Sequence, residues 1–225
     1  MIKNITCSHC GEAGEMTIYP RINISESPEL KDKVRDGSLF IWECPHCGNI
    51  SLSVFQTLYH DPEEKIMIWL LPKGSVSEDE MAALEAHMNT IAEELCKDKD
   101  EGLGGYILRM VNNVGSLIEK VNIYEAGLDD HVVEMCKYVT KLDMLEKLDP
   151  SAAESFMSAP FKFYSLSGPD NDITLSYPFE GQMHGLVIGF NVYEDCRGIL
   201  QRNPAATTGA GFTKVDEEWI SSMMR

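Results

Sequence analysis

The sequence contains no run of about 18 consecutive apolar residues, and it is poor in basic side chains. The missing apolar run predicts that no helix crosses a membrane. Lys and Arg number 19 against 36 Asp and Glu, which gives a formal net charge of −17. Because such a charge repels phosphate groups, and no basic cluster interrupts it, we expect no binding to nucleic acid.

Motifs of several common enzyme classes are also absent. The sequence has no glycine-rich phosphate loop, no dinucleotide-binding fingerprint and no Gly-x-Ser-x-Gly nucleophile elbow. The few residues between Met1 and Cys7 leave no room for a secretory signal before the first motif. We therefore expect a cytoplasmic protein, in which free thiols stay reduced.

The chain has 7 cysteines, and four of them form two matching pairs. Cys7 and Cys10 enclose Ser-His, Cys44 and Cys47 enclose Pro-His, and a glycine follows each pair. One tight turn can aim both sulfurs of a pair at the same point, and four thiolates suit a tetrahedral ion. The pattern Cys-x2-Cys-x33-Cys-x2-Cys therefore predicts a metal site made by these four residues.

Zn²⁺, held as a structural ion, is the metal that this pattern favours. A rubredoxin-like iron site uses the same knuckles, because four sulfur ligands suit both metals. A thioredoxin-like redox pair requires a cysteine at the start of a helix, and neither pair leads into a helical pattern. We expect Gly11 and Gly48 to adopt positive φ, and His9 and His46 not to be ligands.

Residues 1–72 predict an antiparallel, zinc-ribbon-like β module, with about four or five strands around the metal. The expected strands lie near residues 16–24, 39–43, 50–59 and 66–71, and a short helix covers 29–35. His60 and Asp61 invite a catalytic interpretation. Asp-Pro between two apolar strands is turn chemistry, however, and we favour that interpretation.

Residues 73–150 predict a helical segment with 8 basic and 17 acidic side chains, a balance of −9. Ser77 and Glu80 form a capping box at the start of the first helix. The apolar stripe of this helix is expected to pack on the protein's own core, with contact between two copies of the chain as the alternative; it consists of Met81, Leu84, Met88, Ile91 and Leu95.

An αα-hairpin is expected in the second half of this segment. Its first helix is predicted to include Tyr106, Met110 and Val121, and its second to span residues 130–148, with a turn at 125–129 between them. We expect the acidic faces of both helices to be solvated.

Residues 151–225 predict a β-rich segment with a terminal helix over 214–224. Three strands are expected at 161–166, 173–177 and 186–190, while residues 191–200 fit either a strand or a helix. The fold class is therefore α+β. The segments 1–72, 73–150 and 151–225 form three domains or one compact domain, and the C-terminal strands either join the first sheet or form their own. The lone Cys96, Cys136 and Cys196 are expected to be small core residues.

The sequence resembles the CpXC family. The matching segments are Cys7-Ser-His-Cys10-Gly11, Arg21-Ile-Asn with Pro28-Glu-Leu-Lys31, Cys44-Pro-His-Cys47-Gly48, and Leu58-Tyr-His-Asp-Pro62 with 66–72. The resemblance covers residues 3–140, with a looser similarity at 212–219, and Ser8 departs from the Cys-Pro of the pattern. It implies a cysteine-based metal domain and no established activity.

These observations predict a zinc-binding cytoplasmic protein that acts as a binding module for an unknown protein partner. One alternative is an iron-containing electron carrier that uses Cys7, Cys10, Cys44 and Cys47. A second alternative is an enzyme with a site near His60 and Asp61.

Overall fold

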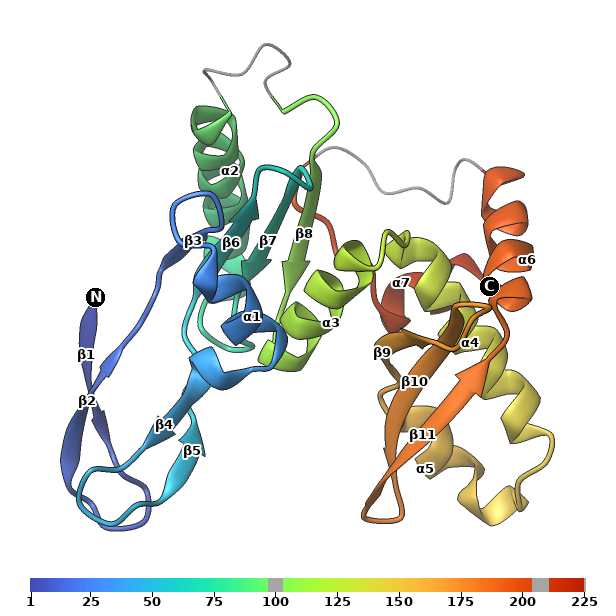
Figure 1. The fold of residues 1–225 in the computed structure, drawn as a ribbon, viewed down its shortest axis with the longest axis horizontal. Helices are drawn as coiled ribbons and strands as arrows, with labels where there is room; N and C mark the ends of the chain where they lie inside the picture. Colours follow the sequence, from blue (N-terminus) through green and yellow to red (C-terminus); the bar gives the residue numbers. More distant parts are fainter. Residues whose placement is uncertain (97–102, 204–210, 225) are drawn as a thin grey trace. The chain divides into compact units, whose positions relative to one another are not determined.

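The computed structural model describes residues 1–96, 103–203 and 211–224 (Figure 1). The chain forms two compact units. The first comprises Met1–Ile118 and a short segment ending at Thr213; the second begins at Glu119 and also includes the residues from Lys214 onward. The predicted division into 1–72, 73–150 and 151–225 stays a prediction.

A four-stranded sheet in the order β3-β6-β7-β8 forms the centre of the first unit. β3 (Arg21–Asn23) runs parallel to β6 (Thr57–Asp61), β6 is antiparallel to β7 (Ile66–Leu70), and β7 is parallel to β8 (Ile107–Val111). β6 and β7 are buried along their whole length. Burial on both faces explains the continuous apolar run of β7. Helix α1 (Glu29–Arg35) follows β3 and buries Leu30 and Val34.

Helix α2 (Glu78–Leu95) packs on one face of this sheet through its apolar stripe (Figure 1). Met88 is buried, and the other four stripe residues pack against the cluster that contains Trp69. The predicted capping box of Ser77 and Glu80 is present. Packing of the stripe on the protein's own core is thereby confirmed, and contact between two copies of the chain stays a prediction.

The four paired cysteines lie on two separate hairpins of the first unit. β1 (Ile2–Thr6) pairs with β2 (Ala13–Thr17), and β4 (Ile41–Glu43), which follows the 3-10 turn η1 (Ser38–Phe40), pairs with β5 (Ile50–Leu52); both pairs are antiparallel. The sequence predicted one sheet around the metal and one strand over 50–59. An interruption after Leu52 instead separates β5 from β6. The likeness to a zinc ribbon stays a prediction.

The predicted start of the second helix is wrong. Tyr106 precedes β8 and Met110 lies within it, whereas helix α3 begins at Val114 and ends at Glu125. Tyr106, Met110 and Val114 follow helical spacing, but β8 gains backbone hydrogen bonds from β7 on one side and from Thr213 on the other. Tertiary pairing overrides the local pattern here.

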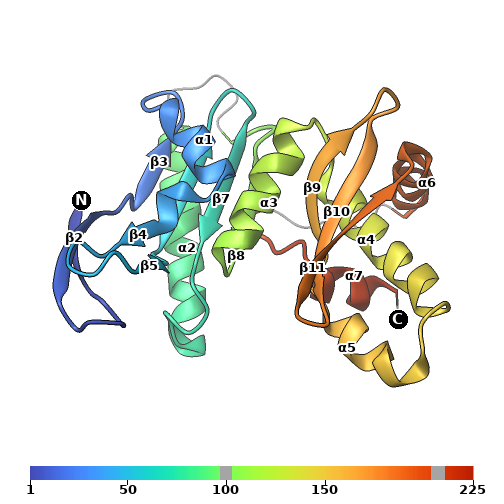
Figure 2. The ribbon, with the colours of Figure 1, turned by 60° about the horizontal axis from the view of Figure 1, so that its bottom comes forward.

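The second unit holds a separate three-stranded antiparallel sheet, seen in Figure 2, in the order β11-β10-β9. Its strands are β9 (Lys162–Ser167), β10 (Asp172–Phe179) and β11 (Gln182–Ile188). The helices around it are α4 (Asp130–Leu145), α5 (Ala153–Ser158) after the 3-10 turn η2 (Pro150–Ala152), α6 (Phe190–Gln201) and α7 (Glu217–Met223).

These elements settle two alternatives that the sequence left open for residues 151–225. The three predicted strands form their own sheet, and the ambiguous residues 191–200 are helical. The described residues thus form a mixed α and β fold, in agreement with the predicted class. Cys96, Cys136 and Cys196 are buried, as expected.

The prediction that the acidic faces of α3 and α4 are solvated is wrong for three residues. Glu119, Asp130 and Glu134 are 1–3% exposed. Lys120 and Lys137, also buried, lie among them and balance their charge. Buried carboxylates persist only with such partners.

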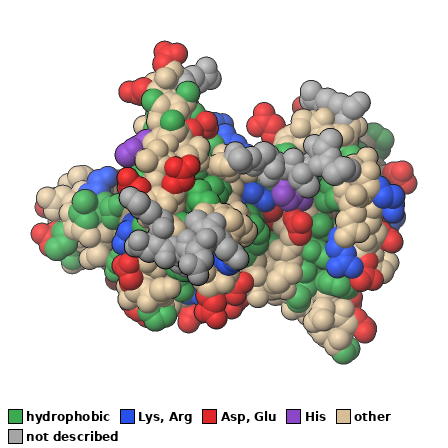
Figure 3. All heavy atoms as spheres, turned by 90° about the horizontal axis from the view of Figure 1, so that it is seen from above, with side chains coloured by type: hydrophobic (Ala, Val, Ile, Leu, Met, Phe, Trp, Pro, Cys, Tyr) green, Lys and Arg blue, Asp and Glu red, His purple; other side chains and the backbone are tan. Residues whose placement is uncertain are grey.

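No helix in residues 1–96, 103–203 and 211–224 has both the length and the apolar character needed to cross a membrane. On the surface visible in Figure 3, acidic side chains are spread among Lys and Arg rather than gathered in one patch.

Candidate metal centre

Each cysteine pair lies in the turn of its hairpin, and the two turns have the same backbone hydrogen bonds. Four bonds of 2.9 Å close them: Cys7 N to Glu12 O, Gly11 N to Cys7 O, Cys44 N to Asn49 O and Gly48 N to Cys44 O. Gly11 and Gly48 have φ of 77° and 70°. The predicted positive φ is confirmed, and a side chain at either position would strain the turn.

The two turns bring all four sulfur atoms together. Sγ of Cys7 lies 3.7 Å from Sγ of Cys47, and Sγ of Cys10 lies 3.7 Å from Sγ of Cys44. All four sulfurs lie within 4.8 Å of one another. In a tetrahedral site with Zn–S bonds of about 2.3 Å, neighbouring sulfurs are about 3.8 Å apart. The cluster therefore has the dimensions of a four-thiolate metal site.

The four thiols differ in exposure and in acidity. Cys7 and Cys44 are buried, whereas Cys10 and Cys47 are exposed. Backbone N–H groups of Cys10 and His9 lower the pKa of Cys7 to about 6. The N–H of Glu12 also lowers the pKa of Cys10, but removal of its sulfur from water and hydrogen bonds to the other thiols outweigh it and raise that pKa to about 12.

The opposite shifts have different causes: backbone N–H groups stabilise the thiolate of Cys7, whereas desolvation and the neighbouring thiols disfavour the thiolate of Cys10. Four thiolates at these distances repel one another, so all four can be charged together only around a cation. A bound divalent metal would displace the remaining protons and hold the two hairpins together.

Direct contacts between the two hairpins position the sulfurs. The indole N–H of Trp42 on β4 donates to the carbonyl of Glu15 on β2 at 3.2 Å. A Cβ atom at Gly14 would lie 2.8 Å from Cζ2 of Trp42 and 3.0 Å from Cδ of Pro45. Neither Trp42 nor Gly14 was predicted from the sequence to be part of the site. A glycine inside a strand is the signal that could have pointed to the close approach.

Neither histidine of the two turns belongs to the sulfur cluster. Nε2 of His46 lies 3.3 Å from the carbonyl oxygen of Ala13, across the hairpin boundary. His9 is exposed. The imidazole of His46 therefore links the two hairpins and does not lie among the metal ligands.

The structure does not combine His60 and Asp61 into one site. They are consecutive residues of β6, so their side chains point to opposite faces of the sheet. Nε2 of His60 lies 3.3 Å from the hydroxyl of Tyr106. Asp61 pairs with Lys31 at 3.1 Å and accepts the N–H of Glu63 at 3.2 Å. The last contact is the turn chemistry that the sequence predicted.

Among the residues that the structure describes, one further cluster could offer three metal ligands, and it was not predicted from the sequence. Asp129, Asp130 and His131 lie together at the start of α4. Asp129 is the N-cap of that helix and accepts the N–H of His131 at 2.9 Å, while Asp130 pairs with Lys120 at 2.7 Å. Helix capping and the lysine account for these carboxylates, and we assign no metal to them.

Comparison with known protein families finds one match. A family model described as CpXC protein matches residues 5–137 of the chain. The match includes the turns of both hairpins and all four clustered cysteines. No curated protein matches the chain, and no solved structure matches it.

Proposed function

The chain belongs to the CpXC family, and on this basis we propose that it is a zinc protein in which the metal has a structural role. Zn²⁺ would be held by Cys7, Cys10, Cys44 and Cys47. By fixing the two N-terminal hairpins, the ion would make them a binding module for another protein in the cytoplasm.

The arrangement of the four sulfurs carries this proposal. Their cross-hairpin separations of 3.7 Å fit the edges of a zinc–thiolate tetrahedron. Two-stranded hairpins are marginally stable on their own, so a metal that joins two of them contributes folding free energy directly. A structural zinc ion needs no open coordination position, and the four thiols supply a closed set.

The surface of the second hairpin supports a role in protein binding. Ile41 and Leu52 are paired across β4 and β5, and they are 47% and 58% exposed. Ile50 is 65% exposed. Aliphatic side chains that gather on a small surface favour contact with another protein. The charge of −17 disfavours nucleic acid as the partner.

Iron is the alternative metal, because four thiolates also suit a rubredoxin-type centre. The same four cysteines would then support one-electron transfer. No contact in the cluster favours iron over zinc.

Metal analysis of protein purified without added metal tests the proposal, together with a visible absorption spectrum. One zinc per chain and no visible absorption are expected. Iron, colour and a reversible one-electron couple would replace zinc with the electron-transfer alternative. Protein that binds neither metal after reduction and reconstitution would contradict both.

Removal of the metal by a chelator tests its structural role. Amide hydrogen exchange of β1, β2, β4 and β5 is expected to accelerate strongly, while exchange of α4 and β10 stays unchanged. Equal exchange of the hairpins with and without metal would contradict a structural role.

A further inference from the structure

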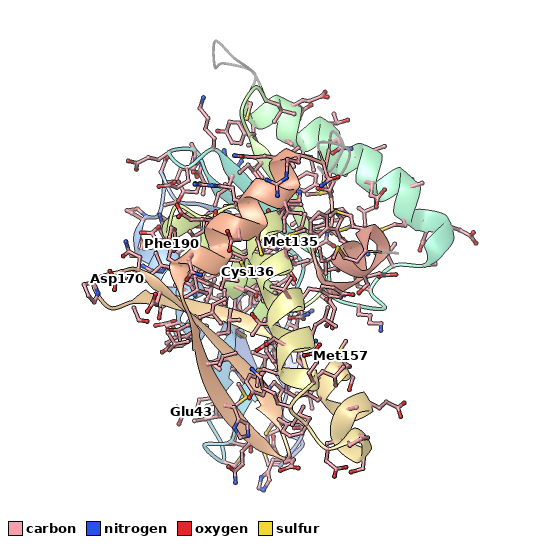
Figure 4. All side chains as sticks on the ribbon, turned by 90° about the vertical axis from the view of Figure 1, so that its right-hand side faces the viewer. Glu43, Met135, Cys136, Met157, Asp170 and Phe190 are labelled. Atoms are coloured by element: carbon pink, nitrogen blue, oxygen red, sulfur yellow. The ribbon has the colours of Figure 1, made fainter. Side chains whose placement is uncertain are left out.

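Strand β11 forms one end of the three-stranded sheet in the second unit, and its outer edge is open. The order β11-β10-β9 gives it a single strand neighbour. It pairs with β10 along its whole length, from Gln182 to Ile188, and none of its residues is buried. Figure 4 shows β11 leading to Phe190, where α6 begins, while Asp170 marks the turn between β9 and β10. In an antiparallel pair only part of the N–H and C=O groups of each strand face the neighbour, so the others point outward from β11.

The opposite edge of this sheet, along β9, is covered. The backbone N–H of Phe163 donates to Oε1 of Glu119 at 2.9 Å, and Nζ of Lys162 lies 2.8 Å from Oε2 of the same carboxylate. Tyr164 is skipped in the pairing with β10, which marks a bulge in β9. Natural sheets use such charges, bulges and side-chain cover to keep further strands from adding. A new strand can therefore add at β11 but not at β9.

The residues of β11 have none of these protective features. They include no charged side chain and no proline, although the chain has a formal net charge of −17, and their register with β10 is continuous. On the outer face of the sheet, Met183 is 68% exposed and Val187 is 56% exposed. On the inner face, Leu186 and Ile188 pack against the core of the unit but stay partly exposed. A strand added at this edge would remove apolar surface from water on both faces.

We propose that β11 is a dimerisation strand, which pairs antiparallel with β11 of a second copy of this chain about a two-fold axis at Gly185. The two three-stranded sheets then become one continuous sheet. In this register every residue of β11 has a partner, since Gln182 lies opposite Ile188 of the other copy. Met183 lies opposite Val187 of the other copy, so the exposed apolar side chains cover each other. An alanine at Gly185 would also fit at the axis, because opposite Cβ atoms of paired strands lie about 4.5–5.5 Å apart.

The sheet itself favours a second copy over another kind of partner. In a second copy β11 is already an ordered strand, whereas a flexible peptide would lose conformational entropy when it adds to the edge. An uncharged strand also lets two acidic chains meet without placing like charges opposite each other. The resulting sheet ends in β9 on both sides, and β9 is covered. The assembly therefore closes as a two-fold dimer and does not extend into a fibre.

The mass of the metal-loaded full chain in solution, measured by sedimentation at increasing protein concentration, tests the proposal. The mass is expected to rise to twice that of the single chain and no further. Amide hydrogen exchange, measured at the two ends of this concentration range, locates the contact. Exchange of β11 is expected to slow in the dimer, while exchange of β9 stays unchanged.

Two double substitutions on the exposed face of β11 test the register. Met183→Lys with Val187→Lys places like charges opposite each other, and we expect the dissociation constant of the dimer to rise about tenfold or more. These lysines also lower the negative charge of the chain, so overall repulsion cannot cause the loss. Met183→Lys with Val187→Glu is the matched variant, which places opposite charges across the axis and is expected to retain the dimer. Tyr164→Lys on β9 is the surface control and should leave the dissociation constant unchanged.

The opposite results would overturn the proposal. A chain that stays a single copy at every concentration has no dimerisation strand. A dimer in which β11 exchanges as fast as in the single chain, or which the two lysines do not weaken, uses another surface. If both double variants lose the dimer to the same extent, the pairing of Met183 with Val187 across the axis is refuted.

Discussion

Nζ of Lys137 lies 2.8 Å from Oε1 of Glu119, although both side chains are almost completely buried. The same ammonium group lies 2.6 Å from Glu134, and Glu119 also accepts the backbone N–H of Phe163 and the ammonium group of Lys162. These contacts connect α3, α4 and β9 within the second unit. Each buried carboxylate has a cation beside it, so this ionic network has no large uncompensated charge.

Loss of the Lys137 ammonium group should strongly destabilise the second unit. Lys137→Met keeps most of the length and the apolar character of the side-chain stem but leaves Glu119 and Glu134 without their shared cation. Removal of one partner from a buried ion pair costs about 3–5 kcal/mol. Urea unfolding should reveal this loss. Lys147→Met is the control: Lys147 pairs with Asp143 at the surface, and its loss should cost less than about 1 kcal/mol. Equal effects of the two substitutions would contradict the role of the network.

Acid should weaken the second unit through Glu119. Burial alone would raise the pKa of this carboxyl group, but Lys137, Lys162 and Lys120 outweigh burial and lower it to about 2. A lowered folded-state pKa stabilises the fold above the unfolded pKa of about 4.3, and this contribution is lost as pH falls toward 2. The pKa of Glu134 is raised, mainly by burial, and acts in the opposite direction.

Urea unfolding curves measured at several pH values test the contribution of Glu119 to acid sensitivity. The free energy of unfolding of the wild type should decline between about pH 5 and about pH 2. Glu119→Gln should show a shallower decline, since the group that titrates is gone. If the slopes of the two proteins are the same, Glu119 is not the source of the acid sensitivity.

A methyl group at Gly14 should disturb the contact between the cysteine hairpins. The new Cβ would overlap Trp42 and Pro45, and overpacking of this kind costs about 1–3 kcal/mol. We expect Gly14→Ala to lower both the thermal midpoint and the metal affinity, measured by competition with a zinc chelator. Gly185→Ala on β11 is the control, because a Cβ there meets no atom within 4 Å. Unchanged metal affinity in Gly14→Ala would show that the hairpins can separate without loss of the site.

Substitution of one clustered thiol should abolish stable metal binding. Cys44→Ser leaves three thiols and a hydroxyl group. A serine hydroxyl group binds the metal of such a site much more weakly than a cysteine thiolate does. Metal content per chain and the thermal midpoint are both expected to fall. His9→Ala changes the exposed residue of the other turn, which lies outside the cluster, and should leave both values unchanged. Full metal content in Cys44→Ser would remove Cys44 from the ligand set.

The cysteine cluster could be predicted from the sequence because the residues that form each half of it are neighbours in the sequence. Each pair lies in one turn, and the glycine after it fixes the turn. The position of the second pair relative to the first was not predictable in the same way. It depends on Trp42 and Gly14, which contact each other across the two hairpins and carry no motif.

Elements defined by distant partners were harder to predict. β8 was expected to be helical, because Tyr106 and Met110 are four residues apart and its strand partners are not its neighbours in sequence. The ionic network was missed for a related reason. Glu119, Asp130 and Glu134 have the composition of a solvated face, and only the packing of α3, α4 and β9 shows that their lysine partners are buried with them.

Phe212 and Thr213 pack in the first unit, although the residues of the second unit from Glu119 onward precede them in the sequence. Thr213 bridges to Arg109 at the outer edge of β8, and Phe212 packs against Trp69. A ribosome that has made the first unit up to Ile118 has therefore not yet made the segment that covers its last strand. During synthesis the edge of β8 stays open to other chains until Thr213 has emerged, which makes this strand a place where a chaperone can protect the nascent protein.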